Sequence, residues 1–133
     1  REDQYTLIKH LSTEPEAMTE AGKKEYDVLV IDGDHSYAGV KTDFENYADF
    51  VRVGGYIIFD DYASEDWPDV AEFVDSELAD VEHIARVGAS WRTCVYRVVK
   101  KPASQHVPMP VSTPKPRSRK LANSAVSVAE EES

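Results

Sequence analysis

The segment DVLVIDGDHSY, residues 27–37, carries the strongest structural signal in this chain. After Asp27 its residues are apolar and mostly β-branched up to Ile31, with no polar position between them. Strands buried on both faces of a parallel sheet have this pattern. A second apolar run, Tyr56 to Phe59, follows the pair Gly54-Gly55, which we interpret as a tight turn into the strand. The two runs predict two strands of one parallel sheet, and acids at their ends would meet if the strands are neighbours.

Helical patterns separate and follow these strands. Apolar residues between positions 38 and 51 recur every three or four residues, which predicts a helix with one buried stripe. Residues 14–24 also suit a helix, with Thr13 as its N-cap. Pro68 is well placed to begin a third helix that runs to about residue 78. A short apolar run at residues 5–8 predicts a first strand before all of these.

The final part of the ordered region is predicted to be a β-hairpin. Residues 81–87 and 93–99 suit two strands, and the short connection at residues 88–90 forces them to be antiparallel. We therefore predict an α/β fold, a Rossmann-like sheet of parallel strands with a C-terminal antiparallel hairpin. The domain would occupy residues 1–101. Residues 102–133, rich in proline and serine without an apolar period, predict a disordered tail.

Composition narrows the classes of function. A length of 133 residues suits one domain, and the formal net charge of −10 argues against a broad nucleic-acid-binding face. No stretch approaches the ~18 apolar residues of a membrane span, and no signal peptide is visible. The single cysteine, Cys94, fits a reducing compartment, so we expect a cytoplasmic protein. A homo-oligomer is compatible with the sequence.

Acidic residues follow both predicted strands at equivalent positions. Asp32 comes directly after Ile31, and Asp60 and Asp61 come directly after Phe59. Ligands bind beyond the carboxyl ends of the strands in open α/β sheets, where these acids would converge. Crowded carboxylates take up protons or share a cation, and oxygen ligands suit Mg²⁺, Ca²⁺ or Mn²⁺. The alternative is that the acids only cap helices and turns, and for Asp34 this is as good an interpretation.

The motifs quoted above, IDGDHSY, the Gly-Gly pair and the acidic pair after the second strand, resemble the C-terminal half of class I methyltransferases. The resemblance covers roughly residues 5–99. It is strongest to the metal-dependent O-methyltransferases, in the group with the macrocin-type sugar O-methyltransferases and the cephalosporin-hydroxylase-like proteins. It implies S-adenosylmethionine as cofactor, Mg²⁺ or a similar ion, and a small molecule with a hydroxyl group as the acceptor.

The resemblance also implies roles for individual residues. Asp32, Asp60 and Asp61 would hold the metal ion. His35 stands where the catechol- and caffeoyl-type relatives have a lysine, and either His35 or Asp32 would remove the acceptor's proton. Ser12 would lie near the adenine of the cofactor, and Asp32 and His35 would also bind the cofactor, although the start of the following helix is the simpler explanation of Ser12.

Three aromatic residues lie just beyond the strand ends, where they would either line an acceptor pocket or serve only as packing: Tyr37, Tyr62 and Trp67.

The chain departs from the pattern of these enzymes in one respect. It contains no GxGxG-like segment, and nothing before Tyr5 supplies the first two strands of their sheet. We therefore expect the edge of the strand ending at Ile31 to be unpaired, and methyl transfer by these residues alone is not expected. The chain would be a fragment of a longer enzyme or a truncated descendant.

Two other functions fit parts of the sequence. Asp32-Gly33-Asp34 is a D-x-D pattern of the kind that nucleotide-sugar glycosyltransferases use to hold Mn²⁺, but this leaves the second acidic pair unexplained. A degenerate α/β interaction domain, with acids that only aid solubility, is the non-enzymatic alternative.

Overall fold

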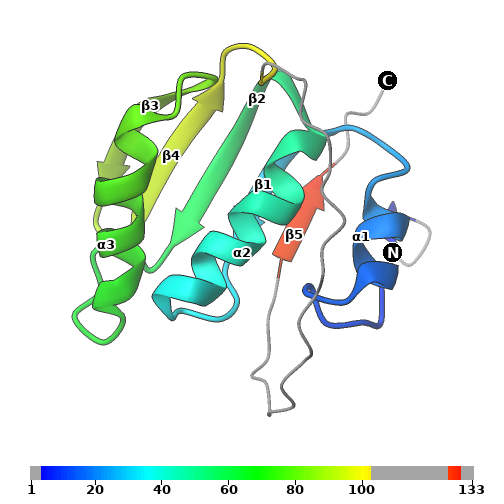
Figure 1. Cartoon of the computed structure of the whole chain (residues 1–133), viewed down its shortest axis with the longest axis horizontal. Coiled ribbons are helices and arrows are strands. Elements are labelled where there is room, and N and C mark those ends of the chain that lie inside the picture. The colour runs from blue at the N-terminus through cyan, green and yellow to red at the C-terminus, as the bar shows by residue number, and fades with distance from the viewer. Residues whose placement is uncertain (1–3, 103–125, 130–133) are drawn as a thin grey trace.

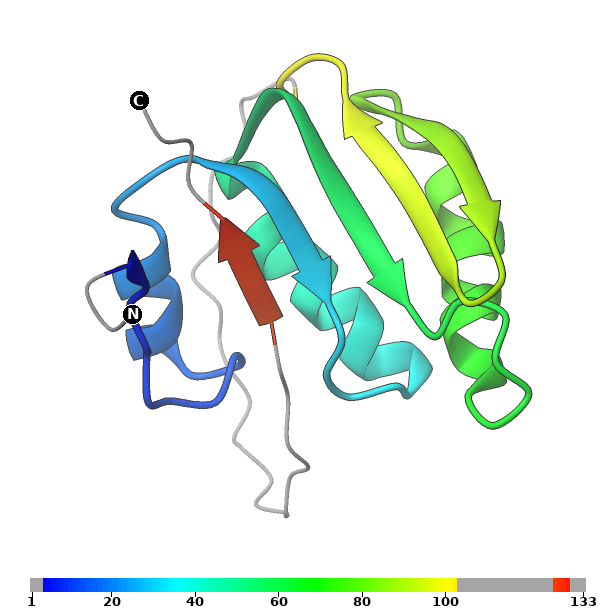
Figure 2. The same cartoon turned by 180° about the vertical axis from the view of Figure 1, so that it is seen from behind.

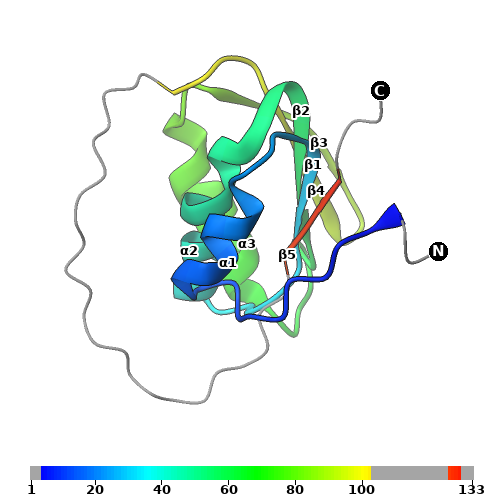
Figure 3. The ribbon, with the colours of Figure 1, turned by 90° about the vertical axis from the view of Figure 1, so that its right-hand side faces the viewer.

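The computed structural model describes residues 4–102 and 126–129. Strands of one sheet alternate with helices that all lie on the same face of that sheet (Figure 1, Figure 3). The elements in chain order are α1 (Pro15–Ala21), β1 (Tyr26–Ile31), α2 (Tyr37–Tyr47), the 3-10 turn η2 (Ala48–Phe50), β2 (Val51–Asp60), α3 (Pro68–Glu77), the 3-10 turn η3 (Leu78–Asp80), β3 (Ile84–Ser90), β4 (Thr93–Val98) and β5 (Val126–Ala129).

The sheet has the strand order β3-β4-β2-β1-β5. Strands β1 and β2 are parallel, and β4 pairs with both β2 and β3 in the antiparallel direction. This arrangement confirms the predicted α/β fold with parallel strands and an antiparallel hairpin. Leu29, Ile57 and Phe59 are fully buried between the sheet and the helices. The apolar face of the sheet therefore holds α2 and α3 in place.

The opposite face of the sheet has no helix among the described residues (Figure 2). Burial along β1 consequently alternates, with Leu29 and Ile31 buried and Val28 and Val30 only partly so. The unbroken apolar run predicted burial on both faces. That prediction is wrong for the described part of the chain, because a second layer of helices is needed to cover the second face.

The outer edge of β1 is paired with β5, in antiparallel register from Ile31 opposite Val126 to Val28 opposite Ala129. The prediction of an unpaired edge is therefore wrong, and β5 departs from the predicted disorder of the tail. An open edge presents unpaired N–H and C=O groups, and even a short extended segment can satisfy them. The rest of the predicted tail, residues 103–125 and 130–133, lies outside the described residues.

The start of the chain differs from the prediction. Residues 5–8 form no strand, and Tyr5 and Leu7 are exposed, because this segment pairs with none of the described strands. Thr13 is not the N-cap of α1. Glu14 takes that position without a side-chain cap, and Pro15 begins the helix, which suits a residue without an N–H group.

Glycines lie inside strands at two places where turns were predicted. Gly54 and Gly55 belong to β2, which begins at Val51, and Gly54 has a φ of +93°. Any side chain at Gly55 would collide with the Asp27 carbonyl oxygen, so the pair permits the close approach of β1 and β2. Gly88 lies within β3 at a shift of register, and the hairpin turns instead at Trp91. No described helix is long and apolar enough to cross a bilayer.

The pairing of β5 can be tested by deleting residues 126–133. Loss of the ladder hydrogen bonds to β5 should speed amide exchange in Val28–Ile31 by roughly fivefold, since each bond contributes about 1 kcal/mol. Hydrogen-exchange mass spectrometry would measure this. Residues 57–58 of β2, paired on both sides, are the internal control and should stay slow. Unchanged exchange in β1 would contradict the pairing.

Candidate functional site

The register of the two parallel strands places the acids side by side. Ile31 pairs with Phe59, so Asp32, directly after β1, and Asp60, the last residue of β2, lie at the same end of the two strands. Asp61 has a φ of 62°, in the left-handed region that is uncommon for a non-glycine residue. This conformation turns the chain directly after β2. The sequence-based prediction that these acids meet is therefore consistent with the backbone.

His35 completes the cluster. Its Nε2 atom lies 2.8 Å from Oδ2 of Asp61 and 3.7 Å from Oδ1 of Asp32. One potential ligand atom from each of Asp32, His35 and Asp61 lies within 4.8 Å of the other two. The side chains of His35 and Asp61 are 19% and 21% exposed, whereas that of Asp32 is 47% exposed. The site is thus a half-open group that a small ligand or ion can reach.

The cluster has an excess of negative charge, which affects the pKa of Asp32. The pKa of Asp32 is raised by burial, then by repulsion from Asp60 and a hydrogen bond with it, and by repulsion from Asp61. The neighbouring His35 lowers this pKa, but the net direction is upward. A bound cation or a shared proton would relieve this excess of negative charge. The donor set, carboxylate oxygens with one imidazole nitrogen, fits a divalent metal ion.

Asp34 does not join the cluster. Its Oδ1 accepts a hydrogen bond from the backbone N–H of Ser36 at 2.9 Å. The Ser36 hydroxyl in turn accepts from the backbone N–H of Gly39 and caps α2. A side chain at Gly39 would collide with Asp34. Asp34 therefore stabilises the loop that leads into α2, in agreement with the capping interpretation. The two aspartates of the D-x-D pattern, Asp32 and Asp34, do not contribute to the same cluster.

Ser12 lies in a separate, buried group. Its hydroxyl donates to Oδ1 of Asp43 at 2.8 Å, and its carbonyl oxygen accepts from the Tyr47 hydroxyl at 2.6 Å. These bonds join the loop before α1 to α2. A contact between Ser12 and the cofactor stays a prediction. Asp43 was not among the predicted residues, although an acid within the apolar stripe of a helix is a signal that burial or function requires it.

The three aromatic residues near the strand ends behave differently. Tyr37 contacts the ring of Phe73, and its hydroxyl donates to Glu77. The Tyr62 hydroxyl donates to Asp75. Trp67 instead stacks on the imidazole of His35, with ring centroids 4.6 Å apart. Packing thus explains the first two, and Trp67 is the one whose ring contacts a residue of the cluster.

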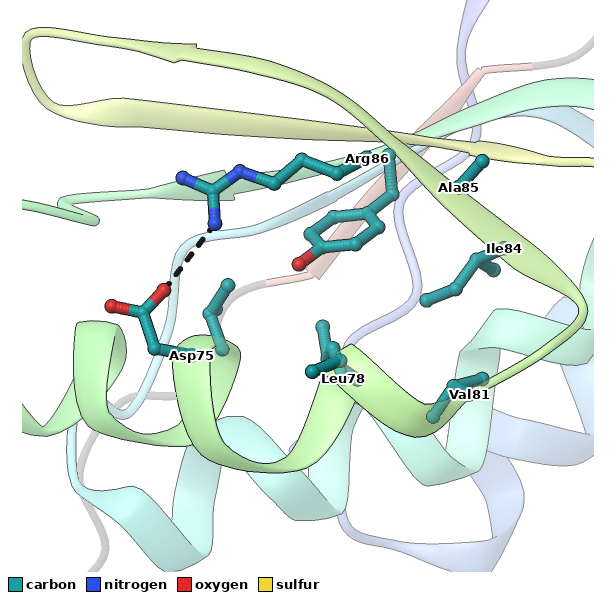
Figure 4. Close-up of a pocket in the computed structure, with 9 residues that line it drawn as sticks. Asp75, Leu78, Val81, Ile84, Ala85 and Arg86 are labelled. Carbon is teal, nitrogen blue, oxygen red and sulfur yellow. Dashed lines mark hydrogen bonds and ion pairs between the residues drawn. The ribbon is translucent and has the colours of Figure 1, made fainter.

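A pocket of about 360 Å³ lies between the end of α3 and strand β3 (Figure 4). Leu78, Val81 and Ile84 form its apolar part. Arg86 at its rim is already paired, with Asp75 at 3.4 Å and the Tyr62 hydroxyl at 3.0 Å. The acidic cluster takes no part in its lining. This pocket is therefore a different place from the candidate site.

The α/β sheet, with acids at the carboxyl ends of two parallel strands, has the fold of a solved methyltransferase. Residues 2–62, a little under half of the chain, match the model of a family described as a methyltransferase domain. The matched region includes every residue predicted to bind the metal ion or the cofactor, from Ser12 to Asp61.

Two relatives give the extent of the likeness. Protein R132 of Acanthamoeba polyphaga mimivirus, whose function is uncharacterized, is 47% identical over 57 residues, which are 42% of this chain and 26% of the viral protein. The MycE methyltransferase of the mycinamycin biosynthetic pathway, solved in complex with Mg and SAH, superposes with a TM-score of 0.50 at 18% identity. That superposition covers 76% of this chain and 33% of MycE, and shows a common fold.

The buried Asp43 predicts a pH-dependent stability. Burial raises its pKa from 3.8 to about 6, although the bond from Ser12 acts in the opposite direction. The pKa of Asp43 is higher in the folded state than in the unfolded state. Protonated Asp43 therefore contributes up to ~3 kcal/mol to the free energy of unfolding below about pH 4, and this contribution is lost as the pH rises through about 6. Urea unfolding of the wild type and Asp43→Asn at several pH values should show this loss only in the wild type.

The exposed variant Asp80→Asn is the matched control and should keep the wild-type dependence. Equal pH dependence in the wild type and Asp43→Asn would exclude Asp43 as its origin.

Proposed function

We propose that this chain carries the metal-binding side of the active site of an S-adenosylmethionine-dependent methyltransferase that methylates the hydroxyl group of a small molecule. The observation that carries the proposal is the convergence of Asp32, His35 and Asp61 at the carboxyl edge of the sheet. The family match and the Mg and SAH bound by MycE support it. The chain spans 26% of the viral protein and 33% of MycE, so the activity proposed is that of a longer protein.

Three carboxylates are proposed to hold the ion, those of Asp32, Asp60 and Asp61. When bound, a divalent ion lowers the pKa of an acceptor hydroxyl and orients its oxygen for transfer. The net charge of −10 suits a cation and a small acceptor better than a nucleic acid.

Two residues are candidates for the base. His35 is oriented by its hydrogen bond to Asp61, as a general base needs to be. Asp32 is the second candidate, because its carboxylate lies 3.7 Å from His35 and is 47% exposed. Ser12, Asp32 and His35 are proposed to lie on the cofactor side of the site.

The metal site is tested by calorimetry of Mg²⁺ binding to the wild type and to Asp60→Asn/Asp61→Asn. Asparagine has the shape of aspartate and tolerates the positive φ at position 61, so the variant removes charge with little strain. We expect Mg²⁺ affinity to fall at least tenfold.

The control Asp80→Asn/Glu82→Gln removes the same two charges from an exposed place elsewhere and should bind as the wild type does. Circular dichroism verifies that each variant is folded. Equal, weak and salt-sensitive binding in all three proteins would refute the metal site and favour an acidic domain without catalytic function.

A further inference from the structure

The indole of Trp67 contacts the cluster of Asp32, His35 and Asp61 through His35. Trp67 directly precedes Pro68, the first residue of α3, and its own side chain makes no cap hydrogen bond. It is 46% exposed, yet one face of its ring stacks on His35 with an interplanar angle of 21°. The stack closes one side of the imidazole. A ring held in this way has little freedom to turn away from the acids.

The position of the His35 ring suits a metal ligand. Its Nε2 faces two carboxylates, at 2.8 Å from Asp61 and 3.7 Å from Asp32. Neighbouring ligands of an octahedral ion with bonds of about 2.1 Å lie ~3 Å apart, so these distances need only small adjustments. Imidazole nitrogen is a good ligand for transition metals, whereas Mg²⁺ prefers oxygen throughout.

We propose that Trp67 is a positioning residue that holds His35 as a nitrogen ligand, and that the site selects a transition-metal ion such as Mn²⁺ over Mg²⁺. The inference rests on the proposed function for the existence of the metal site and adds the identity of the ion and of one ligand. It assigns Nε2 of His35 to the ion instead of to the acceptor's proton. Residues that fix the orientation of a ligating histidine commonly govern metal affinity.

Calorimetry with Mn²⁺ alone and Mg²⁺ alone tests this on the full chain. We expect the wild type to favour Mn²⁺ at least tenfold. His35→Gln should lose most of this preference while its Mg²⁺ affinity changes little. Trp67→Ala should weaken Mn²⁺ binding about tenfold, and Trp67→Phe, which preserves a stacking ring, should restore it. Trp91→Ala is the matched control, because Trp91 is 86% exposed and lies in the hairpin turn.

A second readout reports where the ion binds. The chain has two tryptophans, so a Trp91→Phe background leaves Trp67 as the reporter. Paramagnetic Mn²⁺ bound beside His35 should quench the fluorescence of Trp67, and Mg²⁺ should not.

The outcomes separate the inference from the proposed function. Metal binding that depends on Asp60 and Asp61 but is unchanged in His35→Gln and Trp67→Ala would overturn the inference and keep the metal site. A loss in His35→Gln without any effect of Trp67→Ala would overturn the role of Trp67. Absence of specific binding in the wild type would overturn the proposed function itself.

Discussion

The parallel pairing of β1 with β2 is the constraint on which the candidate site depends. Ile31 lies opposite Phe59, and the next residue of each strand is an aspartate at the same edge of the sheet. Side-chain rotation can adjust the distance between these carboxylates but cannot separate the strands that hold them. The apolar contacts of Leu29 and Ile57 stabilise this arrangement against the repulsion that raises the pKa of Asp32.

The helices bring the remaining residues to this edge. Helix α2 begins just after His35, and α3 begins just after Trp67, so both rings belong to the loops that lead into helices. Phe73 of α3 packs against the rings of α2 and β2 and fixes the two helices relative to the sheet. The stacking of Trp67 on His35 therefore follows from how the helix layer packs, and not from a local motif.

The two faces of the sheet are covered to different extents by the described elements. Its helix-covered face is buried, its opposite face has no helix among the described residues, and β5 pairs with the outer edge of β1. In the enzymes that the sequence resembles, this edge belongs to a strand of the cofactor-binding part. The same backbone groups of β1 cannot pair with two strands at once.

Sequence patterns determined the alternation of strands and helices, the two acidic strand ends and the antiparallel hairpin. Periodicity and strand-end chemistry are local, which is why these predictions succeeded. The same patterns misplaced the turns at Gly54 and Gly88, because a glycine permits a bulge as readily as a turn. Only the tertiary structure decided that β5 pairs with β1, that Ser12 bonds to Asp43 and that Trp67 meets His35. Each of these contacts joins residues more than 30 positions apart, and packing of the whole chain, not its neighbouring residues, brings them together.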